Sequence, residues 1–170
     1  AVPEVDDSTL PAGEAPLPAE DRSEFAARLL SGKFCISVEL DPPREMDPAK
    51  SIAGAAFLKE NGIDVINIAD GPRAVARMNP ASLAQLVQKD SQMESVVHFC
   101  CRDRNLLGMQ MDLLGNHALG LHNILAVTGD PPKMGSYPDA TAVFDIDSVG
   151  LIAFLQMMNR GLDFSGRPMG

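Results

Sequence analysis

The stretch of this sequence that decides the fold is Asn123-Ile124-Leu125-Ala126-Val127-Thr128-Gly129-Asp130-Pro131-Pro132. Its first five residues have the mostly apolar character of a buried parallel strand. The proline pair cannot continue a strand, because proline lacks the backbone donor that a sheet requires. Between them lies a polar Thr-Gly-Asp tip. The stretch therefore predicts a strand with functional groups at its carboxyl end, although a plain turn after a buried strand has the same pattern.

The same arrangement occurs three more times along the chain. Strand-like runs cover residues 34–40, 63–69, 94–101 and 123–127. Helical patterns surround and separate them, with the predicted capping residues Ser23, Asp47, Asn79, Asn105 and Asp147. Strand and helix thus alternate in units of roughly 30 residues, which is typical of parallel strands joined by helical crossovers.

Two architectures contain four such units: an open doubly wound sheet and part of a closed barrel. Neither GxGxxG nor GxxxxGK[ST] is present, which weakens the common nucleotide-binding open sheets. Polar residues instead gather at the carboxyl ends of all four predicted strands, namely Glu39, Asp41, Asp70, Arg102, Asp103, Thr128 and Asp130. Barrel enzymes build their sites at these ends. We therefore predict an α/β fold of the (β/α)8 TIM barrel family, with only the first four βα units in this chain.

The composition is that of a globular protein with one domain. The chain has 170 residues, of which 45% are hydrophobic, and a net charge of −9. Residues 1–24 hold seven acidic residues against one arginine. This acidic opening is also rich in Pro and Ala, which predicts a linker or tail over residues 1–22 and a single domain over residues 23–170.

Several classes of partner have no support in the sequence. No basic stripe is present that could hold a nucleic acid backbone. No apolar run approaches the roughly 20 residues of a membrane span, so we expect no membrane partner. Because the three cysteines suggest no disulfide framework, a reducing compartment and hence a cytoplasmic location are expected. Neither CxxC nor a zinc-type spacing of His and Cys occurs, and Cys35, Cys100 and Cys101 are predicted as small core residues. No metal site is expected. The methionines at positions 109, 111, 157 and 158 are predicted to pack between helices.

Three residues are the first candidates for chemistry. Glu39 lies within its strand, where partial burial would favour the protonated form that a general acid needs, or where an ion pair would hold it. Asp130 either faces positive charge on a bound ring or bonds to its own turn. His98 lies between apolar strand residues and is either a core residue or a ligand contact.

Three stretches together resemble methylenetetrahydrofolate reductase: Val38-Glu39-Leu40-Asp41-Pro42-Pro43-Arg44, His98-Phe99-Cys100-Cys101-Arg102-Asp103-Arg104-Asn105 and Leu125-Ala126-Val127-Thr128-Gly129-Asp130-Pro131-Pro132. The resemblance runs from about residue 23 to residue 170. The second and third stretches look most like the bacterial form that is fused behind a homocysteine S-methyltransferase domain. Residues 1–22 would then be the remnant of the interdomain linker, and a homo-oligomer is possible.

This resemblance implies a flavoprotein oxidoreductase of one-carbon metabolism and methionine biosynthesis. Bound FAD, reduced by NADH or NADPH, would reduce 5,10-methylenetetrahydrofolate to 5-methyltetrahydrofolate. Glu39 matches the family's general acid, and Asp130 matches the carboxylate near the flavin and the pterin. His98 and the backbone of Val127-Thr128-Gly129 match flavin contacts. The four units present imply an activity that is incomplete in this chain alone.

The sequence departs from the family pattern at two cofactor positions. Many members have Thr-Tyr-Gly after the second strand, where this chain has Ala69-Asp70-Gly71. A Tyr that often contacts the cofactor is replaced by Phe144. Each departure removes a hydroxyl group that would contact the flavin.

Two other functions fit the same sequence. Four βα units leave unpaired edges at the first and fourth strands, so the chain could be a non-catalytic half-barrel that assembles with a second copy. A pterin-binding barrel that transfers methyl groups without flavin is a weaker alternative.

Overall fold

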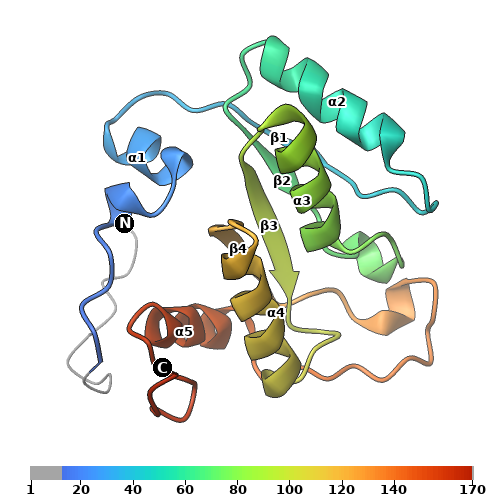
Figure 1. Ribbon diagram of the computed structural model, residues 1–170. Helices are drawn as coiled ribbons and strands as arrows, with labels where there is room; N and C mark the ends of the chain where they lie inside the picture. The colour runs from blue at the N-terminus through green and yellow to red at the C-terminus, as the bar shows by residue number, and fades with distance from the viewer. Residues whose placement is uncertain (1–12, 170) are drawn as a thin grey trace.

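A parallel sheet of four strands lies at the centre of the structure (Figure 1), a computed structural model that describes residues 13–169. The strands are β1 (Ser37–Leu40), β2 (Val65–Ile68), β3 (Ser95–Cys100) and β4 (Asn123–Val127). Each strand pairs with the next one along the chain, in the order β1-β2-β3-β4. Doubly wound sheets reverse direction at a switch point, whereas barrels keep this sequential order. The fold is therefore α/β and consistent with a partial (β/α) barrel, as predicted.

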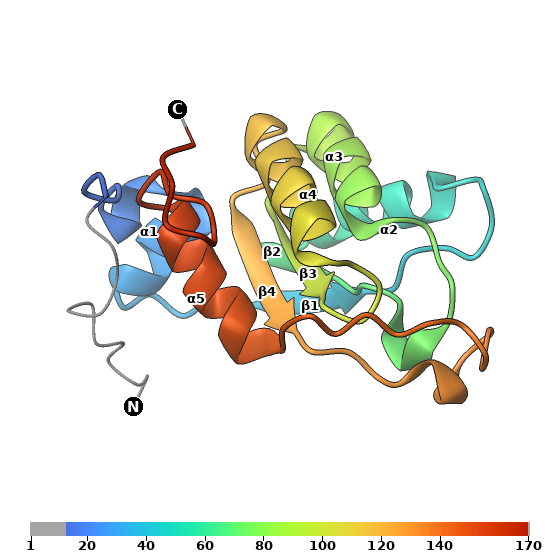
Figure 2. The same ribbon diagram turned by 90° about the horizontal axis from the view of Figure 1, so that it is seen from below.

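Helices follow every strand. The long ones are α2 (Ala49–Glu60), α3 (Pro80–Ser91), α4 (Leu106–Ala118) and α5 (Ser148–Met158). Short 3-10 helices, η3 (Pro72–Ala74) and η4 (Pro132–Met134), lie in the loops after β2 and β4. Figure 2 shows α2, α3 and α4 on one side of the sheet, with α5 beside β4.

Two hydrophobic clusters fill the space between the sheet and these helices. Ile68 and Val97 pack against α2 and α3, whereas Phe99 and Cys101 pack against α4 and α5. Side chains of a strand alternate between its two faces. The residues between these core positions, His98 among them, therefore belong to the opposite face. Glu39 and Leu125 are exposed on that second face, which corresponds to the interior of a barrel.

Helix α1 (Glu24–Leu30) closes the amino-terminal end of the sheet. Its predicted cap is confirmed, because the Ser23 hydroxyl accepts from the Ala26 amide at 2.9 Å. The same hydroxyl donates to Asn123 at the start of β4, and the amide of Phe25 donates to Glu94 before β3. The site-bearing carboxyl ends of the strands lie at the opposite end of the sheet.

The predicted caps of the later helices are confirmed, with one shift. Side chains of Asn79, Asn105 and Asp147 accept from backbone amides in the first turns of α3, α4 and α5. The second helix spans Ala49–Glu60, so that Pro48 rather than Asp47 occupies its N-cap position. The carboxylate of Asp47 still accepts from the Ala49 amide at 2.9 Å, so the capping interaction survives the shift.

Other sequence expectations were wrong in detail. The first strand begins at Ser37 rather than at residue 34, because the amide of Ile36 bonds to the Asp64 carboxylate. Cys35 lies in the segment before β1 and is only half-buried, unlike the core residues Cys100 and Cys101. Met111 is exposed on α4, whereas the other three methionines named above pack in the second cluster or are buried.

Part of the predicted linker lies outside the described residues, namely residues 1–12. Residues 13–22 contain the 3-10 helix η2 (Ala19–Asp21), and the amide of Glu14 donates to the carbonyl of Arg160 after α5. The domain boundary at residue 22 stays a prediction.

Candidate active site

Glu39 lies near the carboxyl end of β1 and belongs to the open face of the sheet. Its side chain is exposed, so the expected partial burial was wrong for this chain. The alternative of an ion pair is also wrong within residues 13–169, where no hydrogen bond or ion pair engages this carboxylate. Within the described residues, Glu39 is thus an exposed carboxylate without a bonding partner, on the edge strand of the sheet.

Asp130 is held by a neighbouring loop rather than by its own turn. Its Oδ2 atom accepts from the backbone amide of Arg73 at 2.9 Å. Arg73 lies in η3, in the loop after β2, so this bond ties the ends of two non-adjacent strands together. One carboxylate oxygen is used in this way, and within residues 13–169 the structure shows no hydrogen bond to Oδ1.

Gly129 brings the backbone after β4 close to β3. Its φ of +102° is a conformation that residues with a side chain rarely adopt. A Cβ atom at this position would lie 2.3 Å from the Cys100 sulfur and 3.1 Å from Arg102 Cβ. Only glycine fits this approach, which gives the Thr-Gly-Asp tip a structural reason.

The Thr128 side chain serves the start of α5. Its hydroxyl accepts from the Ser148 amide at 3.0 Å and lies 3.1 Å from the Ser148 hydroxyl. The sequence assigned only the backbone of residues 127–129 to a ligand. The threonine side chain is already engaged, and the assignment of the backbone to a ligand stays a prediction.

Asp70 and Arg104 form a largely buried ion pair at the ends of β2 and β3. The Asp70 carboxylate accepts from Arg104 at 2.7 Å and from the Cys100 amide at 2.9 Å. Arg104 also bonds to Asp112 on α4 at 2.9 Å and lies over the ring of Phe99, 4.6 Å from its centroid. These two strand-end residues therefore connect the strands to α4.

Burial shapes the electrostatics of His98 in the middle of β3. Desolvation lowers the pKa of this imidazole, while the charges of Glu39 and Asp70 act in the opposite direction. Its Nε2 atom is buried and has no hydrogen-bond partner within the described part of the chain. Buried polar atoms normally have such a partner, so this nitrogen is an exception that calls for an explanation.

The remaining predicted cofactor residues lie around these groups. Ala69 directly follows β2 and is buried, and Val127 ends β4. Phe144 is partly exposed with a φ of +46°, next to Val143, whose amide bonds to the Arg102 carbonyl at 2.8 Å. The structure thus brings the predicted residues to the carboxyl half of the sheet, with Glu39 on the outermost strand.

Arg102 is the residue whose importance the sequence did not reveal. It is only 5% exposed, although it follows β3 at a polar tip. Its guanidinium forms a two-bond pair with Asp103, which raises the pKa of Arg102, and it also donates to the Asp130 carbonyl at 3.2 Å. A sequence signal for this role was weak, because any arginine beside an aspartate has the same pattern.

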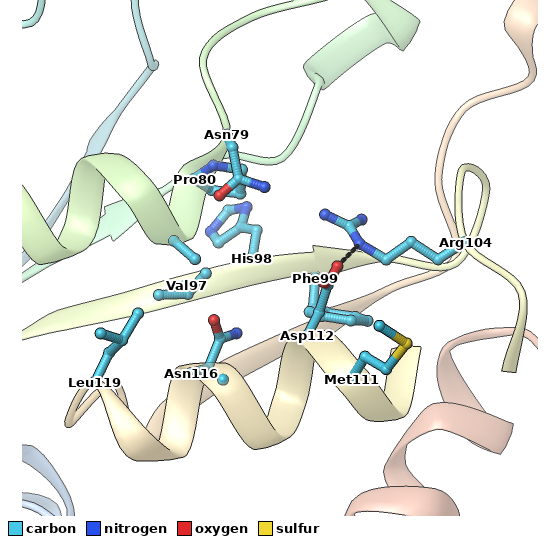
Figure 3. A pocket seen from close by; sticks show the side chains of 12 residues that line it. Asn79, Pro80, Val97, His98, Phe99, Arg104, Met111, Asp112, Asn116 and Leu119 are labelled. Carbon is cyan, nitrogen blue, oxygen red and sulfur yellow. Dashed lines mark hydrogen bonds and ion pairs between the residues drawn. The ribbon is translucent and has the colours of Figure 1, made fainter. Parts of the chain in front are cut away.

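Two pockets accompany the loops. One of about 200 Å³ lies between α3 and α4, with residues 97–99 of β3 behind it and the Arg104–Asp112 pair at one end (Figure 3). The other, of about 300 Å³, lies between the loops after β2, β3 and β4 and is lined by Arg77, Arg102 and Tyr137 among others.

Within residues 13–169, no three His, Cys, Asp or Glu side chains are grouped as metal ligands. None of the helices described is long and apolar enough to cross a membrane.

Fold and site together define a class of protein: a barrel-type α/β protein with acidic groups at the carboxyl ends of parallel strands. The family model for methylenetetrahydrofolate reductase matches residues 24–161, most of the chain. The chain therefore belongs to the methylenetetrahydrofolate reductase family, whose members are TIM barrels. A search among curated proteins found no match. Membership supports a methylenetetrahydrofolate reductase-type oxidoreductase function with a folate-related substrate.

Proposed function

We propose that this chain takes part in the flavin-dependent reduction of 5,10-methylenetetrahydrofolate to 5-methyltetrahydrofolate, with NADH or NADPH as the source of electrons. The observation that carries the proposal is the tip after β4, where Gly129 is pressed against Cys100 and Asp130 is fixed by the Arg73 amide. This geometry agrees with the matched family and with the role that the resemblance gives to Asp130.

The residues present are compatible with a bound FAD. The open face of the sheet offers surface for a flat ring beside Leu125, which is 44% exposed. The unpaired Nε2 atom of His98 is suited to a hydrogen bond with a ring heteroatom, and the absence of a side chain at Gly129 allows close approach to the backbone. Flavin, when bound there, supplies the hydride for the reduction.

The protein's own groups then have separate tasks. Glu39, unengaged on the open face, would donate the proton that helps to open the bridging ring of the folate. The fixed carboxylate of Asp130 would stabilise positive charge that develops on the bound rings. The Arg73 amide helps to hold that carboxylate in place, so little reorganisation is needed during the reaction.

The wider setting follows from the same resemblance. We propose that the four βα units form the first half of an eight-unit barrel and that residues 1–22 link it to a homocysteine S-methyltransferase domain in a cytoplasmic protein. The second and third resembling stretches support the fused form. The sequential parallel order of the strands supports the barrel.

The test begins with flavin absorbance and stoichiometry of the purified protein and of a version extended beyond residue 170. In whichever form binds flavin, E39Q should leave flavin binding intact and lower folate reduction by about 10²-fold or more, since it removes a general acid. D130N should change both half-reactions. The matched control is E60Q, at the exposed end of α2. Full folate reduction by E39Q would contradict the role of Glu39.

A second candidate is a half-barrel that assembles with another copy. Within the described residues, β1 and β4 each pair along one edge only, and exposed edges favour association. Light scattering distinguishes this half-barrel from the reductase: a homogeneous dimer without flavin favours the half-barrel that assembles with a second copy. Flavin binding by neither form favours the pterin-only alternative.

A further inference from the structure

Arg102 connects the three loops that form the carboxyl end of the site. Its guanidinium donates to the carbonyl of Asp130 after β4 at 3.2 Å and lies 3.5 Å from the carbonyl of Gly71 after β2. Its own carbonyl accepts from the Val143 amide. A side chain that is 5% exposed and bonded to the backbone of the loops after both neighbouring strands acts as a cross-link between these loops.

The pair with Asp103 fixes the plane of this guanidinium. Nε and Nη2 donate to the two carboxylate oxygens at 2.8 and 2.7 Å, in the forked geometry that only arginine can offer. Nη1 is left to reach the Asp130 carbonyl. Because Asp103 is about half-exposed, its charge is solvated and its main structural effect is to orient Arg102.

The loop after β2 needs such a restraint, because its backbone is strained. Gly71, Arg73 and Ala74 have φ values of +53°, +57° and +55°. Residues with a side chain pay about 1–3 kcal/mol in this region and keep the conformation only where contacts enforce it. The strained conformation is the one in which the Arg73 amide bonds to the Asp130 carboxylate.

We propose that Arg102 is a positioning residue for Asp130. It holds the Asp130 carbonyl directly, and through Gly71 it holds the strained loop whose Arg73 amide fixes the carboxylate. Asp130 thereby accepts one bond at its carbonyl from the loop after β3 and one at its carboxylate from the loop after β2. The functional meaning of this restraint rests on the proposed function, in which Asp130 lies near the bound rings.

The first test does not depend on flavin. Hydrogen exchange of the Arg73 amide, followed residue by residue by NMR, should be about tenfold faster or more in R102M. Amides of β2 and β3 should keep their protection. R102K keeps the positive charge but cannot form the two-bond pair with Asp103, so its Arg73 amide should exchange at an intermediate rate. R102K replaces R102M in this test if R102M does not fold. R28M removes the exposed pair with Asp64 near the opposite end of the sheet and should leave Arg73 unchanged. Unchanged Arg73 exchange in the folded Arg102 variants would overturn the proposal.

The second test connects the restraint to function through a double-mutant cycle. Flavin affinity is compared for wild type, R102M, D130N and the double variant. If Arg102 acts through Asp130, adding R102M to D130N should change the affinity far less than R102M does in the wild type. If R102M lowers flavin affinity by the same factor in D130N as in the wild type, Arg102 has only a general structural role and the proposal is overturned. If the wild type does not bind flavin, the proposed function is contradicted but the positioning role of Arg102 is not. That role is still tested by the exchange rate of the Arg73 amide.

Discussion

At the scale of single residues, Gly129 is a tight steric constraint in the candidate site. We expect G129A to lower the free energy of unfolding by at least about 1–3 kcal/mol, because it combines a disfavoured φ with a Cβ 2.3 Å from the Cys100 sulfur. Urea denaturation measures this change. The matched control is G54A within α2, where a Cβ meets no other atom within 4 Å and where alanine should stabilise by about 0.5–1 kcal/mol. Equal stability of G129A and wild type would contradict the close approach.

The same scale shows what the sequence could reveal about the site. Glu39 and Asp130 were predicted because a carboxylate after an apolar run has a visible local pattern. The exposure of Glu39 and the bond from Arg73 to Asp130 had no such pattern, since they depend on how β1 ends and how two distant loops meet. Arg102 was noted only as a polar tip residue. Its burial follows from neighbours on both sides of β3 that local periodicity does not encode.

At the scale of elements, caps were predicted better than strand ends. A capping side chain acts within three residues, so Ser23, Asn79, Asn105 and Asp147 were recognisable from the sequence. A strand extends only as far as its partner does. The apolar run from residue 34 therefore predicted three residues that lie before the start of the β1–β2 ladder at Ser37.

The start of α5 gives a test at this scale. T128V removes the hydroxyl that accepts from the Ser148 amide at 3.0 Å while keeping the shape of the side chain. We expect a loss of about 1 kcal/mol in unfolding free energy, the usual value of a capping interaction, with an unchanged urea m-value. Flavin affinity of the flavin-binding form should change little, because the proposed contact uses the backbone. T141V, at an exposed threonine in the preceding loop, is the control. An unchanged stability of T128V would contradict a role of this hydroxyl in holding α5.

At the scale of the whole molecule, the burial of His98 makes stability depend on pH. Desolvation lowers its pKa below 6.5 in the folded protein, so His98 stays neutral to a lower pH than in the unfolded chain. As pH falls through 6.5, the unfolded chain takes up a proton that the folded protein does not. The contribution of this group is thus fully present above that pH and declines below it, until the folded protein is protonated as well.

We therefore expect the free energy of unfolding of the wild type to fall between pH 7.5 and about 5 more steeply than that of H98Q, which lacks the titrating group. Carboxylates titrate alike in both proteins, so the difference between the two curves isolates His98. H122Q, at an exposed histidine, controls for the loss of an imidazole. Parallel curves for wild type and H98Q would contradict the depressed pKa. Since Glu39 and Asp70 oppose the effect of burial, E39Q should enlarge the pH dependence, which would link the open face of β1 to the centre of β3.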